Sequence, residues 1–131
     1  MIVVDSSAFL EYYRPRGDPE TSSTVAEAIS QDQVAVNGLI QVEIISYAAS
    51  GAARDRLISD FKAFHWLDLN RADFALAHDL GFQLRQTGVT IPATDLIIAA
   101  SAINYDAILY HRDRHFDLIA RSVPLAVQSF L

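Results

Sequence analysis

The strongest constraint on the fold of this 131-residue chain is the segment 91–102, which consists almost entirely of apolar and small side chains. A helix that is apolar on all of its faces is normally buried in a domain core. One acid, Asp95, lies in the first turn of this expected helix. An ionised carboxylate is costly to remove from water unless it is paired or binds a cation. Asp95 therefore has either a functional role or, as the simpler alternative, a favourable contact with the positive end of the helix dipole.

A second segment repeats this pattern. Residues 39–47 form an expected helix that is apolar on nearly all faces, and Glu43 is its single acid, one turn in. We expect Asn37 or Gly38 to begin this helix and Gly51 to end it. Two apolar helices that each carry one acid near the beginning indicate that the two acids share a purpose.

Short apolar runs rich in β-branched residues alternate with helical patterns along the chain. Strands are expected at residues 1–4, 33–36, 63–69 and 106–110, with a final strand or extended tail at 124–127. Helices are expected between them, including 54–61, an amphipathic helix at 71–87 and a short helix at 117–120. This alternation predicts an α/β fold with a mostly parallel central sheet flanked by helices. A length of 131 residues suits one domain that spans residues 1–131.

Charge and composition exclude several classes of function. The net charge of −6 argues against a nucleic-acid binder that works by bulk phosphate neutralisation, but it permits a nuclease whose acids hold cations. The chain has no cysteine, and therefore no disulfide, thiolate nucleophile or cysteine-ligated zinc. No apolar run approaches the ~20 residues that span a bilayer, and the N-terminus does not resemble a signal peptide. We expect a cytoplasmic protein that does not associate with membranes.

Four acids stand out by their positions. Asp5 follows the first strand, Asp113 follows the strand that contains Ile108, and Glu43 and Asp95 lie near the beginnings of helices. Ligands of open α/β sheets bind beyond the carboxyl ends of the strands, so the four carboxylates are expected to converge there. Four neighbouring carboxylates do not all stay ionised without cations. Oxygen ligands without cysteine favour Mg²⁺ or Mn²⁺, and such an acidic pocket suits phosphodiester hydrolysis.

The motifs that surround these acids fall in a familiar order: Asp5 followed by Ser6 and Ser7, Glu43 in an apolar helix, the helix that begins near Asp95, and the segment 109–116. In order and spacing they resemble PIN-domain nucleases, and the chain looks like a VapC-type toxin of a toxin–antitoxin pair. The resemblance covers nearly the whole chain. It implies a single PIN-like domain and a metal-dependent endoribonuclease in which Asp5, Glu43, Asp95 and Asp113 bind Mg²⁺ or Mn²⁺. It also implies an RNA substrate, a homodimer and inhibition by a cognate antitoxin protein.

The last motif departs from this family. The family often has a small polar residue such as threonine at the place of His111, and a second aspartate at the place of His115. We choose Asp113 as the fourth acid, and Asp117, four residues further on, is the alternative. A pair of histidines that binds metal is less expected here, because the segment crosses the end of a strand and lacks the usual glutamate between them. We expect His111 and His115 either to be exposed or to contact the phosphate backbone when protonated.

Two interpretations remain open for the arginines beside Asp113 and for the serines after Asp5. Arg112 and Arg114 either position phosphate or form a solvated charged segment. Ser6 and Ser7 are expected to cap the first helix or to support the site rather than act as nucleophiles, because no histidine is placed to activate them.

A partner surface is expected near the N-terminal helices, with Phe9, Tyr12 and Tyr13 as candidates. The main functional alternative is a non-catalytic PIN-like interaction module, which would keep the fold and the partner surface without metal chemistry. Retention of all four acids favours the enzyme.

Overall fold

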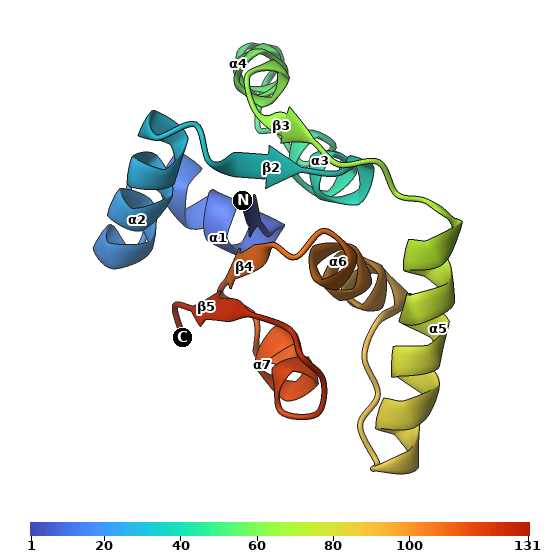
Figure 1. The fold of residues 1–131 in the computed structure, drawn as a ribbon. Coiled ribbons are helices and arrows are strands. Elements are labelled where there is room, and N and C mark those ends of the chain that lie inside the picture. The colour runs from blue at the N-terminus through green and yellow to red at the C-terminus, as the bar shows by residue number, and fades with distance from the viewer.

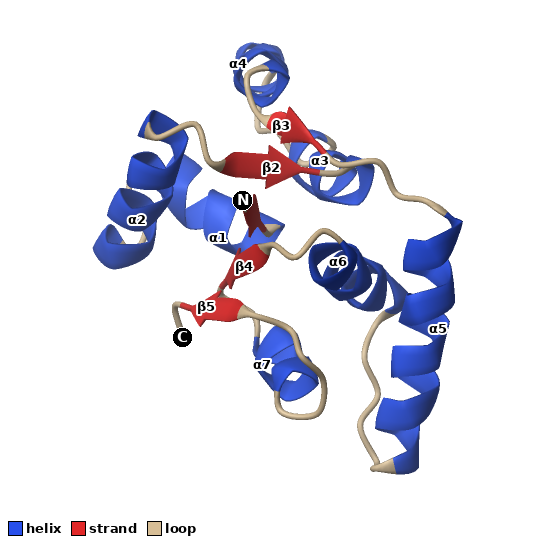
Figure 2. Ribbon diagram, viewed as in Figure 1, coloured by secondary structure: helices blue, strands red, loops and turns tan.

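The computed structural model describes residues 1–131, which form seven helices and five strands (Figures 1 and 2). Their order is β1 (Ile2–Val4), α1 (Ser6–Tyr13), α2 (Pro19–Ser30), β2 (Val34–Val36), α3 (Gly38–Ile45), α4 (Gly51–Lys62), β3 (His65–Trp66), α5 (Arg71–Gln86), α6 (Ala93–Asn104), β4 (Ile108–His111), α7 (Arg114–Ala120) and β5 (Val127–Ser129). The strands form one sheet in the order β3-β2-β1-β4-β5, and every neighbouring pair is parallel. The α/β prediction is confirmed.

The centre of the sheet determines where the functional edge lies. β1 pairs with β2 on one side and with β4 on the other, with Val4 opposite Tyr110. The backbone N–H of Asp5 continues this ladder by donating to the carbonyl of Tyr110 at 2.9 Å. All strands run in the same direction, so their carboxyl ends lie at one edge. Asp5 is therefore held at that edge by the central strand itself.

α6 is the buried helix that its composition predicts. All five residues from Ile98 to Ala102 are buried, and so is Asp95 in the first turn. α5 packs along α6, while α1 packs along α2 (Figure 1). α6 is enclosed because α5 covers the side that faces away from the sheet. An apolar stripe would have been enough for a helix that contacted only the sheet.

α3 is less buried than expected and ends earlier. It finishes at Ile45, not near Gly51, and Val42 is 65% exposed while Tyr47 beyond its end is 86% exposed. Gly51 instead begins α4, because the side chain of Ser50 accepts a hydrogen bond from Ala53 N and caps the new helix. The glycine expected to stop one helix is thus the first residue of the next.

The remaining boundaries shift by a few residues. α1 is capped by Asp5, whose carboxylate accepts from Ser7 N, and not by Ser6 or Ser7. The last strand lies at Val127–Ser129 rather than 124–127, because it pairs with β4 in the register Leu109–Val127. No helix in the structure combines the length and apolarity needed to cross a bilayer.

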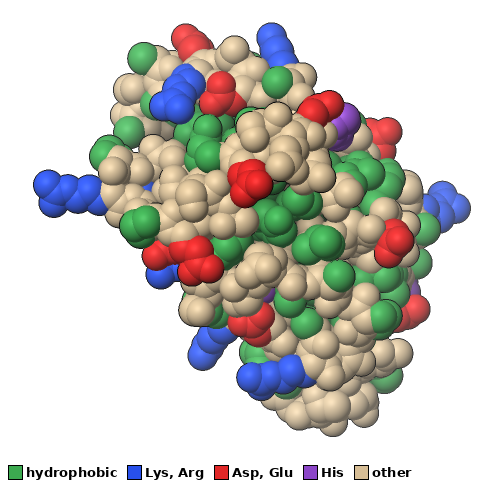
Figure 3. Space-filling model, turned by 60° about the vertical axis from the view of Figure 1, so that its left-hand side comes forward, with side chains coloured by type: hydrophobic (Ala, Val, Ile, Leu, Met, Phe, Trp, Pro, Cys, Tyr) green, Lys and Arg blue, Asp and Glu red, His purple; other side chains and the backbone are tan.

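Charged side chains are interspersed over the face drawn in Figure 3. Basic side chains project singly, with acidic and hydrophobic groups between them, and do not gather into one basic patch on this face. The interspersed charges on this face agree with the net charge of −6.

A buried acid joins α5 to α6. Asp73 is fully buried and forms a capping box with Asn70, and its Oδ1 accepts from Asn104 Nδ2 at 2.8 Å at the end of α6. The start of α5 is therefore fixed to the end of the buried helix by hydrogen bonds to one charged group.

We expect Asp73→Ala to lower the free energy of unfolding by about 2–3 kcal/mol, because it removes the capping box and leaves Asn104 without its partner. Asp79→Ala is the matched control, since Asp79 lies on the exposed face of the same helix. Urea denaturation of both variants measures the difference. Equal stability of the two variants would contradict the assigned role of Asp73.

Candidate active site

Asp5 is a buried carboxylate at the end of the central strand. Its Oδ2 accepts from the backbone N of Ser7 at 3.1 Å and from Ser7 Oγ at 2.6 Å. Ser7 Oγ in turn accepts from Arg112 N at 2.9 Å. Ser7 therefore connects the carboxylate after β1 to the loop after β4 and fixes the distance between the two segments. A supporting role for Ser7, one of the two roles expected of it, agrees with these contacts.

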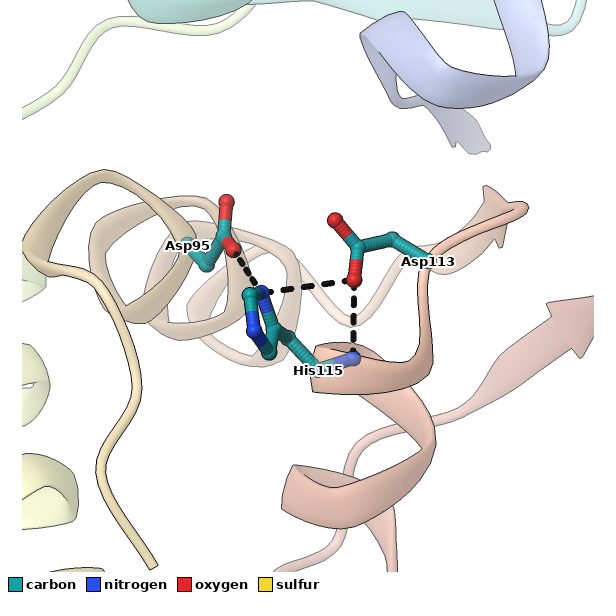
Figure 4. A group of neighbouring side chains, drawn as sticks. All are labelled: Asp95, Asp113 and His115. Carbon is teal, nitrogen blue, oxygen red and sulfur yellow. Dashed lines mark hydrogen bonds and ion pairs between the residues drawn. The ribbon is translucent and has the colours of Figure 1, made fainter.

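Asp95 and Asp113 face one another across a histidine (Figure 4). His115 Nδ1 lies 2.8 Å from Asp95 Oδ2 and 3.3 Å from Asp113 Oδ1. Asp95 belongs to the first turn of α6, whereas Asp113 is the N-cap of α7 and accepts from His115 N at 2.9 Å. One ligand atom from each of the three residues lies within 4.8 Å of the others.

Glu43 completes the group from α3. Its Oε1 is buried and has no hydrogen-bond partner. Burial, together with the smaller effect of the charges of Asp5, Asp95 and Asp113, raises the pKa of Glu43 to about 7. All four predicted acids are therefore close enough to influence one another, although they come from four separate segments of the chain.

Asp5 and Asp95 also resist ionisation. The pKa of Asp5 is raised to about 6, mainly by burial and to a lesser extent by the charge of Asp95, although the hydrogen bonds from Ser7 act against the shift. Burial also raises the pKa of Asp95, although its hydrogen bond from His115 opposes the shift. The cause is the same in each case, because a carboxylate near other carboxylates and away from water is destabilised in its charged form.

The profile of the PIN domain family matches residues 2–122 of the chain. The chain belongs to the PIN domain family. Ribonuclease VapC11 of Mycobacterium tuberculosis is 33% identical to this PIN domain over 134 residues, and the alignment covers 99% of each protein.

Two solved structures share the fold of this PIN domain. FitAcB from Neisseria gonorrhoeae aligns with a TM-score of 0.79 at 21% identity and covers 97% of this chain and 96% of that one. A toxin–antitoxin complex from Klebsiella pneumoniae aligns with a TM-score of 0.71 at 15% identity, over 87% and 88% of the two chains. At these identities the likeness supports the fold alone.

The residues of this PIN domain fit the divalent cation that the family implies. The observation that tests the fit is Glu43 Oε1, a buried acceptor without a donor, which faces three further carboxylates that raise its pKa. A cation supplies the positive charge that such a group lacks, and carboxylate oxygens are the ligands that Mg²⁺ and Mn²⁺ prefer.

Asp113, not Asp117, joins this group. Asp117 lies on α7, where its Oδ1 is 3.2 Å from His111 Nε2 and its Oδ2 accepts from Ser129 Oγ at 3.0 Å. The helix begins at Arg114 rather than at Asp117, because Asp113 caps it. This places Asp117 one turn into α7, where it contacts β4 and β5 instead of the acidic group.

The two histidines differ from expectation. His111 is fully buried rather than exposed, because β4 extends through it and its ring packs beside Phe116. His115 is partly exposed but faces the acids, as described above. The sequence carried a signal for this position of His115. A capping aspartate such as Asp113 places the residue two positions later in the first turn of the helix, beside the carboxylate of the aspartate.

One further expectation, a partner surface at Phe9, is wrong, while the phosphate-positioning role of Arg112 stays a prediction. The side chain of Arg112 is 39% exposed, and its guanidinium contacts Glu11 Oε1 at 3.0 Å and the Phe130 carbonyl at 3.2 Å. Phe9 is fully buried between the rings of Phe61 and Phe64 and therefore offers no partner surface.

The raised pKa values predict how pH affects metal-free protein. The stabilising contribution of protonated Asp5 is complete below its ordinary pKa of 3.8 and is lost as pH rises through about 6. We therefore expect Asp5→Asn, which keeps an acceptor for Ser7, to abolish a pH-dependent loss of up to about 3 kcal/mol between pH 4 and 7. Urea unfolding in EDTA across this range tests it. Identical pH profiles for the two proteins would contradict the assignment.

Proposed function

We propose that this PIN domain, residues 1–131 acting as one unit, is a metal-dependent endoribonuclease that serves as the toxin of a toxin–antitoxin pair. The observation that carries the proposal is the convergence of four carboxylates from the end of β1, α3, α6 and the β4–α7 loop into one group at the carboxyl edge of the sheet. The 33% identity to a ribonuclease over the full length of both proteins supports the same activity.

The proposal assigns a role to each acid. Asp5, Asp95 and Asp113 bind the principal cation, directly or through water, while Glu43 completes that set, holds a second cation or positions the attacking water. Mg²⁺ or Mn²⁺ bound there would supply a Lewis acid for phosphodiester hydrolysis. The protein groups fix the geometry: Ser7 holds Asp5, and the α7 cap holds Asp113.

The non-catalytic alternative is not favoured. An interaction module has no need to keep Asp5, Asp95 and Glu43 together where burial raises the pKa of each. Clustered acids destabilise a fold until a bound cation offsets their charge. Groups with perturbed pKa values of this kind are typical of functional sites.

We assign the cognate antitoxin, the partner that the toxin role requires, to a groove between α1, α3 and α4. The groove is mainly apolar and is lined by residues that include Leu10, Tyr13, Ile44, Tyr47 and Leu57. Tyr13 was one of the expected partner residues, and exposed Tyr47 adds a large ring to the same surface. The proposal also includes a homodimer, which light scattering of the purified protein would detect.

RNA cleavage in the presence of Mg²⁺ or Mn²⁺ tests the activity. We expect cleavage of a mixed RNA pool to stop in EDTA and to fall by more than about 100-fold in Asp95→Asn, which removes a charge with little change of volume. Asp79→Asn, on the exposed face of α5, is the matched control and is expected to cleave RNA like the wild-type protein. Cleavage that persists in EDTA or in Asp95→Asn would overturn the proposal.

A pair of neighbouring variants separates the two candidates for the fourth acid. We expect Asp113→Asn to lose activity while keeping its fold, because asparagine also caps helices well. Asp117→Asn is expected to retain activity and to lose some stability, because it weakens the hydrogen bond that the carboxylate accepts from Ser129 Oγ. Thermal unfolding and RNA cleavage of both variants are measured together. Loss of activity in Asp117→Asn alone would reverse the assignment.

A further inference from the structure

One side chain in the acidic group is a nitrogen ligand. His115 presents Nδ1 to both Asp95 Oδ2 and Asp113 Oδ1, at 2.8 and 3.3 Å (Figure 4). The three side chains offer one ligand atom each within 4.8 Å of one another. Two ligands that each lie about 2.1–2.3 Å from the same ion are at most about 4.6 Å apart, so only small side-chain adjustments would let all three hold one ion.

The local structure fixes the ring in this orientation. Asp113 caps α7 and accepts from His115 N, so the backbone that carries the imidazole is held by the carboxylate beside it. The side chain of His115 is 27% exposed, so the ring lies at the surface of the protein and not in its core. No large rearrangement is needed to present the nitrogen to a cation held by Asp95 and Asp113.

No other histidine is placed to do this. His65 and His78 are exposed and lie beside Asp32 and Asp79 on other parts of the surface. His111 is buried, and its Nδ1 accepts from the backbone N of Asp113. A histidine ligand in this pocket would therefore be His115, which makes the assignment testable with one substitution.

We propose that His115 Nδ1 is a direct ligand of the cation and gives this pocket a preference for Mn²⁺ over Mg²⁺. The inference deepens the proposed function, because it concerns the cation on which that function rests. Mg²⁺ prefers oxygen ligands and gives up its water reluctantly. Imidazole nitrogen binds first-row transition metals well, so replacing one oxygen ligand by nitrogen raises the relative affinity for Mn²⁺.

Electron paramagnetic resonance of added Mn²⁺ tests the ligand directly. We expect pulsed spectra of the wild-type complex to show modulation from the ¹⁴N of a coordinated imidazole, and His115→Asp to bind Mn²⁺ without it. Calorimetric titration with MgCl₂ and MnCl₂ gives the ratio of the two dissociation constants. We expect this ratio, Mg²⁺ over Mn²⁺, to fall by about tenfold in His115→Asp. His78→Asn is the matched control and is expected to keep both the modulation and the ratio.

Two results would overturn the inference: Mn²⁺ bound by wild-type protein without ¹⁴N modulation, or the same ratio of dissociation constants in wild type and His115→Asp. The wild-type spectrum needs no variant, so a folding defect in His115→Asp does not remove the test. Nitrogen-ligated Mn²⁺ in a protein that cleaves no RNA would support the inference and overturn the proposed function. Metal-dependent RNA cleavage by a protein that binds Mn²⁺ through oxygen ligands alone would support the proposed function and overturn the inference about His115.

Discussion

The burial of neighbouring carboxylates is the constraint on which the rest of this PIN domain depends. Burial and neighbouring negative charge raise the pKa of Asp5 and Glu43 to about 6 and about 7, and the pKa of Asp95 is also raised. Such a group weakens the fold at neutral pH unless a cation neutralises it. The surrounding structure must therefore be rigid enough to hold the acids together, and its rigidity comes from elements that perform no chemistry.

Backbone geometry and helix caps provide that rigidity. Asp5 extends the ladder of the central strand and is fixed by Ser7, which also binds the backbone after β4. Asp113 caps α7, and Asp73 ties α5 to the end of the buried α6. Each contact is a hydrogen bond to a carboxylate or to the backbone. The acids are thus positioned by hydrogen bonds, some within one segment and some between distant ones, on segments whose relative places the parallel sheet determines.

Several features of the site were predictable because local patterns carry them. A short β-branched run followed by Asp5 indicates a buried strand with an acid at its carboxyl end, and the apolar helix around Asp95 indicates burial. The structure brings together all four acids chosen in this way. The choice between Asp113 and Asp117 was open in the sequence, and it depended on where α7 begins. That boundary is set by a single capping carboxylate, and boundaries of this kind are the least predictable part of a helix.

The sequence by itself determined the order of strands and helices, the α/β class and the edge of the sheet at which the acids meet, because hydrophobic periodicity and strand order need no knowledge of side-chain contacts. Only the tertiary structure decided that His111 is buried against Phe116, and that His115 faces Asp95 and Asp113. It also decided that Arg112 binds Glu11 instead of lying free. The physical reason is that these contacts join residues up to about a hundred positions apart, and packing of α1, α6 and α7 around the sheet sets their distances.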